Sequence, residues 1–115
     1  NLVRNVQNGE PEKMSLEQIR REGMRWNIIN TLNKARPHTT SEVFLVDVMR
    51  GIYHQVTALE LRQQLEHLSD RKLVALVKQP SGRWFADLTR LGVDIAEYTI
   101  DCQPGIARPE KYWSD

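Results

Sequence analysis

The residues best suited to chemistry in this chain lie in one helical segment and in the basic stretch that follows it. In the segment 57–71, Arg62 can pair bidentately with guanine and Gln63 with adenine. Thr57, at the predicted start of the helix, can contact a phosphate. The residues that we predict to bind DNA are Thr57, Arg62, Gln63, His67, Arg71, Lys78 and Arg83.

Positive charge is concentrated between residues 71 and 90, where five Lys or Arg residues face a single acid, Asp87. The whole chain has a formal net charge of only +1. Lys78 and Arg83 flank a Pro-Ser-Gly tip, from which they can reach a phosphate or a minor groove. Equally, charges at such a tip can keep the protein soluble and prevent its edge strand from pairing with another chain.

The segment 57–70 is less favourable to a polyanion, since it holds one cation, Arg62, against Glu60, Glu66 and Asp70. Acidic side chains there repel phosphates unless they point aside. A solvated helix face is therefore the alternative interpretation of this segment.

We expect neither catalysis nor a metal site, and no cofactor. His38, His54 and His67 are scattered without metal-ligand spacing, and Cys102 is the only cysteine. The six glycines form no phosphate-binding loop.

Composition bounds the class of protein. A chain of 115 residues, 40% hydrophobic and 27% charged, fits a single globular domain. Its longest apolar run, residues 73–77, is far shorter than a membrane span, and no signal-peptide core begins the chain. We therefore expect no membrane partner and a location in the cytoplasm.

Capping boxes predict three helix starts, at Ser15 with Gln18, Thr39 with Glu42, and Thr57 with Glu60. Helical periodicity follows each one, over residues 16–35, 41–50 and 58–71. Arg36-Pro37 ends the first helix and Gly51 closes the second. In the third, Leu61, Leu65 and Leu68 form the expected buried stripe.

Two apolar runs, 73–79 and 83–88, are joined by Pro80-Ser81-Gly82 and predict a β-hairpin. Trp84 and Phe85 are adjacent and should point to opposite faces, one packing on the core and one open to a partner. A helix is expected over 89–98, with Thr89 as its N-cap. The predicted fold is mainly α with a small hairpin: three helices, a β-wing and a C-terminal helix. We divide the chain into a peripheral segment 1–13, a domain 14–100 and a tail 101–115.

This order resembles the winged helix-turn-helix superfamily. The resemblance rests on the Leu-x-x-Leu helix, the Asp70-Arg71-Lys72-Leu73-Val74 entry to the hairpin, and Leu88-Thr89-Arg90-Leu91-Gly92 after it. The segments 14–22 and 104–109 are similar to the ends of a functionally unassigned family of small proteins in Mu-like phages and prophages. That resemblance implies a phage setting, with the cytoplasm of a bacterial host as the location, and supplies no site residues.

Apolar residues form two stripes on the first helix. Met24, Ile28 and Leu32 can close the core, and Leu16, Ile19 and Trp26 form the second stripe. We expect the second stripe to make a homodimer interface, with packing inside the monomer as the alternative.

Two functions remain in view. The first is a transcriptional regulator of phage or prophage type that contacts duplex DNA through helix 57–71 and the wing 73–88. The alternative is a winged-helix adaptor that binds phage proteins during assembly or packaging.

Overall fold

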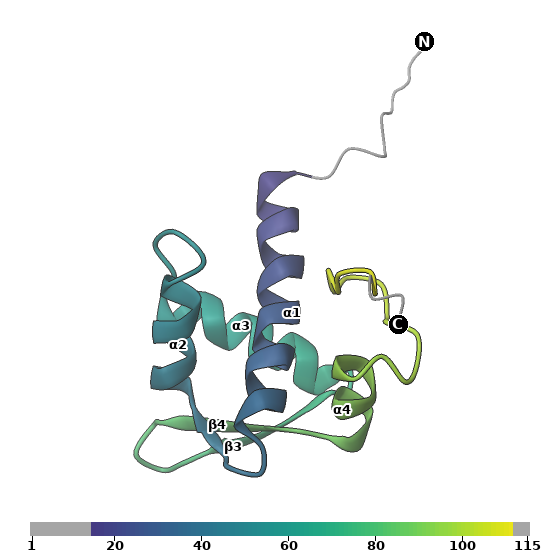
Figure 1. The fold of residues 1–115 in the computed structure, drawn as a ribbon. Helices are drawn as coiled ribbons and strands as arrows, with labels where there is room; N and C mark the ends of the chain where they lie inside the picture. Colours follow the sequence, from purple (N-terminus) through teal and green to yellow (C-terminus); the bar gives the residue numbers. More distant parts are fainter. Residues whose placement is uncertain (1–14, 112–115) are drawn as a thin grey trace.

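The computed structural model describes residues 15–111 (Figure 1). Its elements are α1 (Leu16–Ala35), β2 (Thr40–Ser41), α2 (Glu42–Arg50), α3 (Ala58–Asp70), β3 (Val74–Lys78), β4 (Trp84–Leu88) and α4 (Arg90–Ala96). The predicted class, mainly α with a small hairpin, is confirmed. Residues 1–14, which include the predicted peripheral segment 1–13, and residues 112–115 lie outside the described residues.

All four helices begin at a serine or threonine whose hydroxyl caps the first turn, and three of these caps were predicted. The side chains of Ser15, Thr57 and Thr89 accept hydrogen bonds from the backbone N–H three residues on, as predicted. The predicted cap at Thr39 is wrong, since Ser41 caps α2. The reason is tertiary: Thr40 and Ser41 pair with β4 as a third strand, and the Thr39 hydroxyl donates to Asp87.

The sheet is antiparallel, in the order β2-β4-β3. Its long pair runs in register from Val74 opposite Leu88 to Lys78 opposite Trp84. Gly82 takes a φ of +95° in the turn, a conformation that glycine adopts without a steric penalty. We call β3, β4 and the turn between them, residues 74–88, the wing.

The core lies between the helices and the sheet. The predicted stripe of α3 is fully buried, as are Met24 and Ile28 of α1. Gly92 lets α4 approach the sheet, because a Cβ there would lie 2.3 Å from the Leu73 carbonyl oxygen. This packing holds α3 and the wing against one body.

The first residues of α1 project beyond the other helices (Figure 1). Leu16 is 84% exposed and Ile19 is 50% exposed. Trp26, the third residue of the predicted dimer stripe, is half-buried, with its ring in edge contact with Tyr98 at 6.1 Å between centroids. Packing inside the monomer thus accounts for Trp26, while Leu16 and Ile19 remain open to a partner.

The segment after α4 folds back beside α1 and α4 (Figure 1). Ile106 is 7% exposed and belongs to the hydrophobic core. The backbone N–H of Ala107 donates to the Glu22 carbonyl, and Arg25 donates to the Gly105 carbonyl. Residues 101–111 therefore pack onto the body of residues 16–96.

Candidate nucleic-acid interface

The outward face of α3 is the first part of the candidate interface. Leu59 is 67% exposed, and Gln63 and Asp70 are also exposed. Gln63 borders a polar groove of about 530 Å³ between α1 and the start of α3. Of the two residues expected to read bases, Arg62 and Gln63, Gln63 is the exposed one. Thr57 is exposed at the start of the same helix, where its hydroxyl accepts from the Glu60 N–H.

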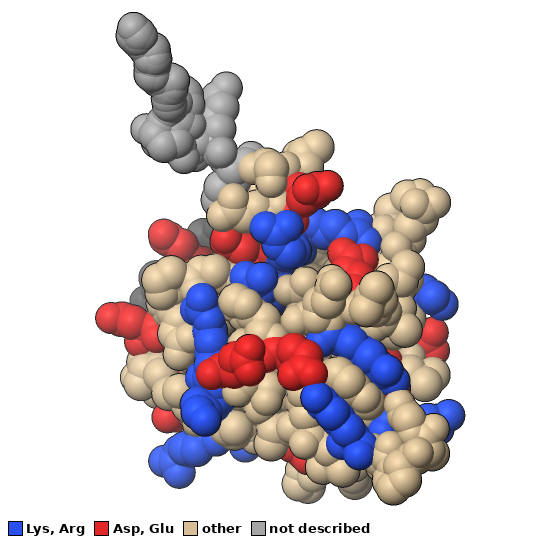
Figure 2. Space-filling model, turned by 180° about the vertical axis from the view of Figure 1, so that it is seen from behind, with Lys and Arg blue, Asp and Glu red and all other residues tan. Residues whose placement is uncertain are grey.

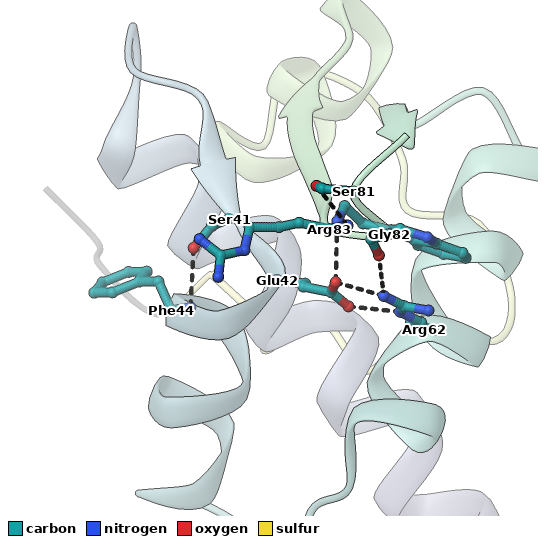
Figure 3. Close-up of polar contacts among 8 residues, drawn as sticks. Ser41, Glu42, Phe44, Arg62, Ser81, Gly82 and Arg83 are labelled. Carbon is teal, nitrogen blue, oxygen red and sulfur yellow. Dashed lines mark hydrogen bonds and ion pairs between the residues drawn. The ribbon is translucent and has the colours of Figure 1, made fainter. Parts of the chain in front are cut away.

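Arg62 lies on the side of α3 that faces the wing and α2 (Figure 3). Its Nε and Nη2 donate to the two carboxylate oxygens of Glu42, each at 2.6 Å. Nη2 also donates to the carbonyl oxygen of Gly82 at 2.6 Å. Arg62 thus joins α3 both to the first residue of α2 and to the tip of the wing.

Glu42 is 7% exposed, and its charge is fully engaged. In addition to Arg62, it accepts from the backbone N–H of Trp84 at 3.0 Å. The hydrogen bonds from Arg62 hold the pKa of Glu42 below its usual value, against the opposing effect of burial. A position in the first turn of α2 also favours a negative charge.

The ring of Trp84 contacts both Arg62 of α3 and Lys78 of the wing. The Arg62 guanidinium carbon lies 4.5 Å and the Lys78 Nζ 4.4 Å from the centre of its ring. Lys78 also pairs with Glu66 of α3 at 2.6 Å, in an exposed ion pair.

Arg83 is the least engaged of the predicted cationic residues, although its charge helps to lower the pKa of Glu42. It is exposed at the tip of the wing, and its guanidinium has no hydrogen bond or ion pair with the described part of the chain. Figure 3 shows its side chain extending away from Arg62. It is therefore available to a phosphate.

His67 and Arg71 lie on a different side of α3, against the C-terminal segment. Arg71 donates to the Pro104 carbonyl at 2.6 Å. The Nε2 atom of His67 is buried without a hydrogen-bond partner among the described residues. Burial lowers the pKa of His67, and the nearby charges of Arg25 and Arg71 lower it further. The structure does not bring these two residues together with Gln63 and Arg83.

Charge on the molecule is mixed. Figure 2 shows Lys and Arg interleaved with Asp and Glu on the face seen from behind, with no continuous basic field. The five cations counted between residues 71 and 90 are dispersed, since Arg71 turns to the C-terminal segment, Lys78 to Glu66 and Arg90 to Asp94. Contact with a polyanion would rest on a few cations, with Arg83 foremost.

Sequence reasoning missed Glu42 as a partner of Arg62, because its spacing from Thr39 fitted a capping box. It also treated Trp84 only as a packing or stacking residue. The available signal was weak: Arg62 is the only cation among residues 57–70. Its partner is 20 residues away in the chain and could not be named from spacing.

Other kinds of site find little support in residues 15–111. No three His, Cys, Asp or Glu side chains gather there as a metal site. Burial raises the pKa of the Cys102 thiol, which disfavours the reactive thiolate. No helix in this range is long and apolar enough to cross a membrane.

Three helices, a wing packed beside the third and a closing helix define a winged-helix fold. Solved structures of the Lactococcus lactis protein ZitR are similar to it. A double mutant of ZitR in apo form matches with a TM-score of 0.52 and 12% identity, over 66% of this chain and 53% of that one. A single mutant matches with a TM-score of 0.51 and 10% identity, over 81% and 55%.

The chain spans about half the length of these ZitR structures. No protein-family model matches the chain, and no curated protein matches it. The likeness to ZitR establishes the fold.

Proposed function

We propose that this protein binds duplex DNA, with the outward face of α3 in the major groove and the wing tip on the sugar-phosphate backbone. The observation that carries the proposal is the placement of Arg83 on a wing that is fastened directly to α3. In a winged helix this arrangement lets one helix enter a groove while the hairpin reaches the adjacent backbone. Gln63 is then the base reader, with adenine as its preferred partner.

The proposal has three finer parts, which are a regulatory role, a homodimer and a phage setting. We further propose a role as transcriptional regulator, which the winged-helix order of the elements suggests. The homodimer rests on Leu16 and Ile19, whose exposure leaves an apolar surface on the projecting end of α1. The phage setting rests only on the resemblance of segments 14–22 and 104–109.

The direct test is fluorescence anisotropy with labelled random-sequence duplex, titrated from low to physiological salt. We expect binding that weakens steeply with salt, and an Arg83→Ala variant whose log–log salt slope is smaller by about 1. The matched control is Arg90→Ala, since Arg90 is 90% exposed and lies at the far end of β4 from the tip. Equal effects of the two substitutions would refute a phosphate contact specific to the wing.

A second function, protein binding, is favoured by the composition of the α3 outward face. Leu59 is 67% exposed, Asp70 is exposed without an ion pair among the described residues, and Val77 of the wing is 53% exposed. Such a surface suits a protein partner better than a phosphate backbone. No binding to DNA even at low salt would favour this function, and pull-down with a Leu59→Glu variant as the control would then test it.

A further inference from the structure

The hydrogen bonds of Arg62 leave no pair of parallel N–H groups free to contact a base. A bidentate contact to guanine needs two parallel N–H groups, from either Nε with Nη2 or Nη1 with Nη2. Both forks include Nη2, whose two hydrogens are taken by Glu42 and by the Gly82 carbonyl. The face of the guanidinium also lies against the Trp84 ring. Arg62 can read guanine only if these contacts break.

Breaking them is unfavourable because of Glu42. Its carboxylate is buried, although the Arg62 side chain is 34% exposed, and removing the cation leaves a buried negative charge without its partner. A base edge that attracted Arg62 would have to overcome this loss as well as the loss of the bond to Gly82. The pair is therefore a stable part of the free protein.

The same contacts hold the wing at two of its residues, Gly82 and Trp84. Gly82 accepts from Arg62, and the Trp84 N–H donates to Glu42. Arg83 lies between these two anchored residues. A hairpin tip is ordinarily among the most mobile parts of a domain, so this attachment restricts the orientations open to Arg83.

We infer that Arg62 is a positioning residue: paired with Glu42, it fixes the wing against α3 so that Arg83 is presented to the DNA backbone, and it reads no base. This inference rests on the proposed function for the role of Arg83, whereas the fastening of the wing can be tested without DNA. A mobile wing would lower the affinity for every DNA sequence, because the wing would have to be ordered on binding.

The first experiment measures amide hydrogen exchange by NMR in the full chain. We expect Arg62→Met and the isosteric Glu42→Gln each to speed exchange of the Trp84 amide by roughly tenfold or more, relative to core amides of the same variant. The matched control is Arg20→Met, since Arg20 makes the same two-pronged contact with Glu60 and does not touch the wing. Trp84 exchange in either variant that matches the control would overturn the inference.

The second experiment measures DNA binding by the same variants. We expect Arg62→Met to weaken binding severalfold on all duplexes with an unchanged salt slope, and Arg83→Ala to lose most of its effect in that background. Arg62→Lys keeps the charge but loses the fork, so it should not restore affinity. Loss confined to guanine-containing sites, or a slope reduced by about 1, would overturn the inference.

The two experiments separate the possible failures. If the wild-type protein binds no DNA, the proposed function fails, and hydrogen exchange alone judges the fastening of the wing. If DNA is bound and exchange at Trp84 is unaffected by Arg62→Met, the proposed function stands and the positioning role fails.

Discussion

Truncating Ile106 to alanine tests whether the C-terminal segment is an integral part of the folded domain. Ile106 is 7% exposed and packs in the core, although it lies ten residues beyond the end of α4. Truncation of a buried isoleucine to alanine costs about 2–5 kcal/mol. Ile106 lies at the rim of the core, where neighbours can collapse into the space, so we expect the lower end, about 2–3 kcal/mol.

Urea denaturation followed by circular dichroism and by tryptophan fluorescence measures this change. In thermal unfolding the same change should lower the melting temperature by roughly 10 °C, at roughly 4 °C per kcal/mol for a domain of this size. The matched control is Ile100→Ala, in the same segment but 38% exposed, for which we expect about 1 kcal/mol or less. If the two variants lost equal stability, to within about 0.5 kcal/mol, Ile106 would not be anchoring the segment and the reasoning would be refuted.

Three further predictions concern other parts of the fold. Gly92→Ala should destabilise by about 3 kcal/mol in thermal unfolding, because its Cβ would meet a backbone carbonyl oxygen at 2.3 Å; Gly82→Ala, with open space but a φ of +95°, should cost only about 1 kcal/mol. Burial lowers the pKa of His67 below 6.5, so the unfolded chain binds a proton more readily and stability falls as pH drops through 6.5 toward the lowered value. His67→Gln should flatten the urea midpoint between about pH 7 and pH 5, and an unchanged slope would contradict this. Glutamate at both Leu16 and Ile19 should turn a dimer into a monomer in sedimentation velocity, while wild-type protein that already sediments as a monomer would exclude the interface.

The parts of the fold that were predictable from the sequence are those that depend on near neighbours in the chain. The caps at Ser15, Thr57 and Thr89 need only a hydroxyl and an N–H three residues on. The buried stripe of α3 follows from the helical repeat, and the hairpin from two apolar runs about a Pro-Ser-Gly turn. Thr39 shows where this reasoning ends, since a valid local capping pattern was overridden by strand pairing with residues 85 and 86.

The candidate site was only partly predictable. Gln63 and Arg83 are exposed, as expected of residues that meet DNA. Arg62 and Arg71 have the same chemical types as residues that bind DNA, but each is engaged by a distant segment, and the Nε2 atom of His67 is buried. Residue type and helix face could not indicate this, because the covering groups come from the start of α2 and from residues 103–105.

By itself the sequence determined the order of the helices and hairpin and the face of α3 that is buried. Periodicity and capping suffice for these because they act over a few residues. Only the tertiary structure decided which cations remain free, since a long arginine side chain pairs with whatever carboxylate or carbonyl the fold brings within reach. In this protein Glu42 holds Arg62 and Pro104 holds Arg71, while Arg83 is left exposed at the tip of the wing.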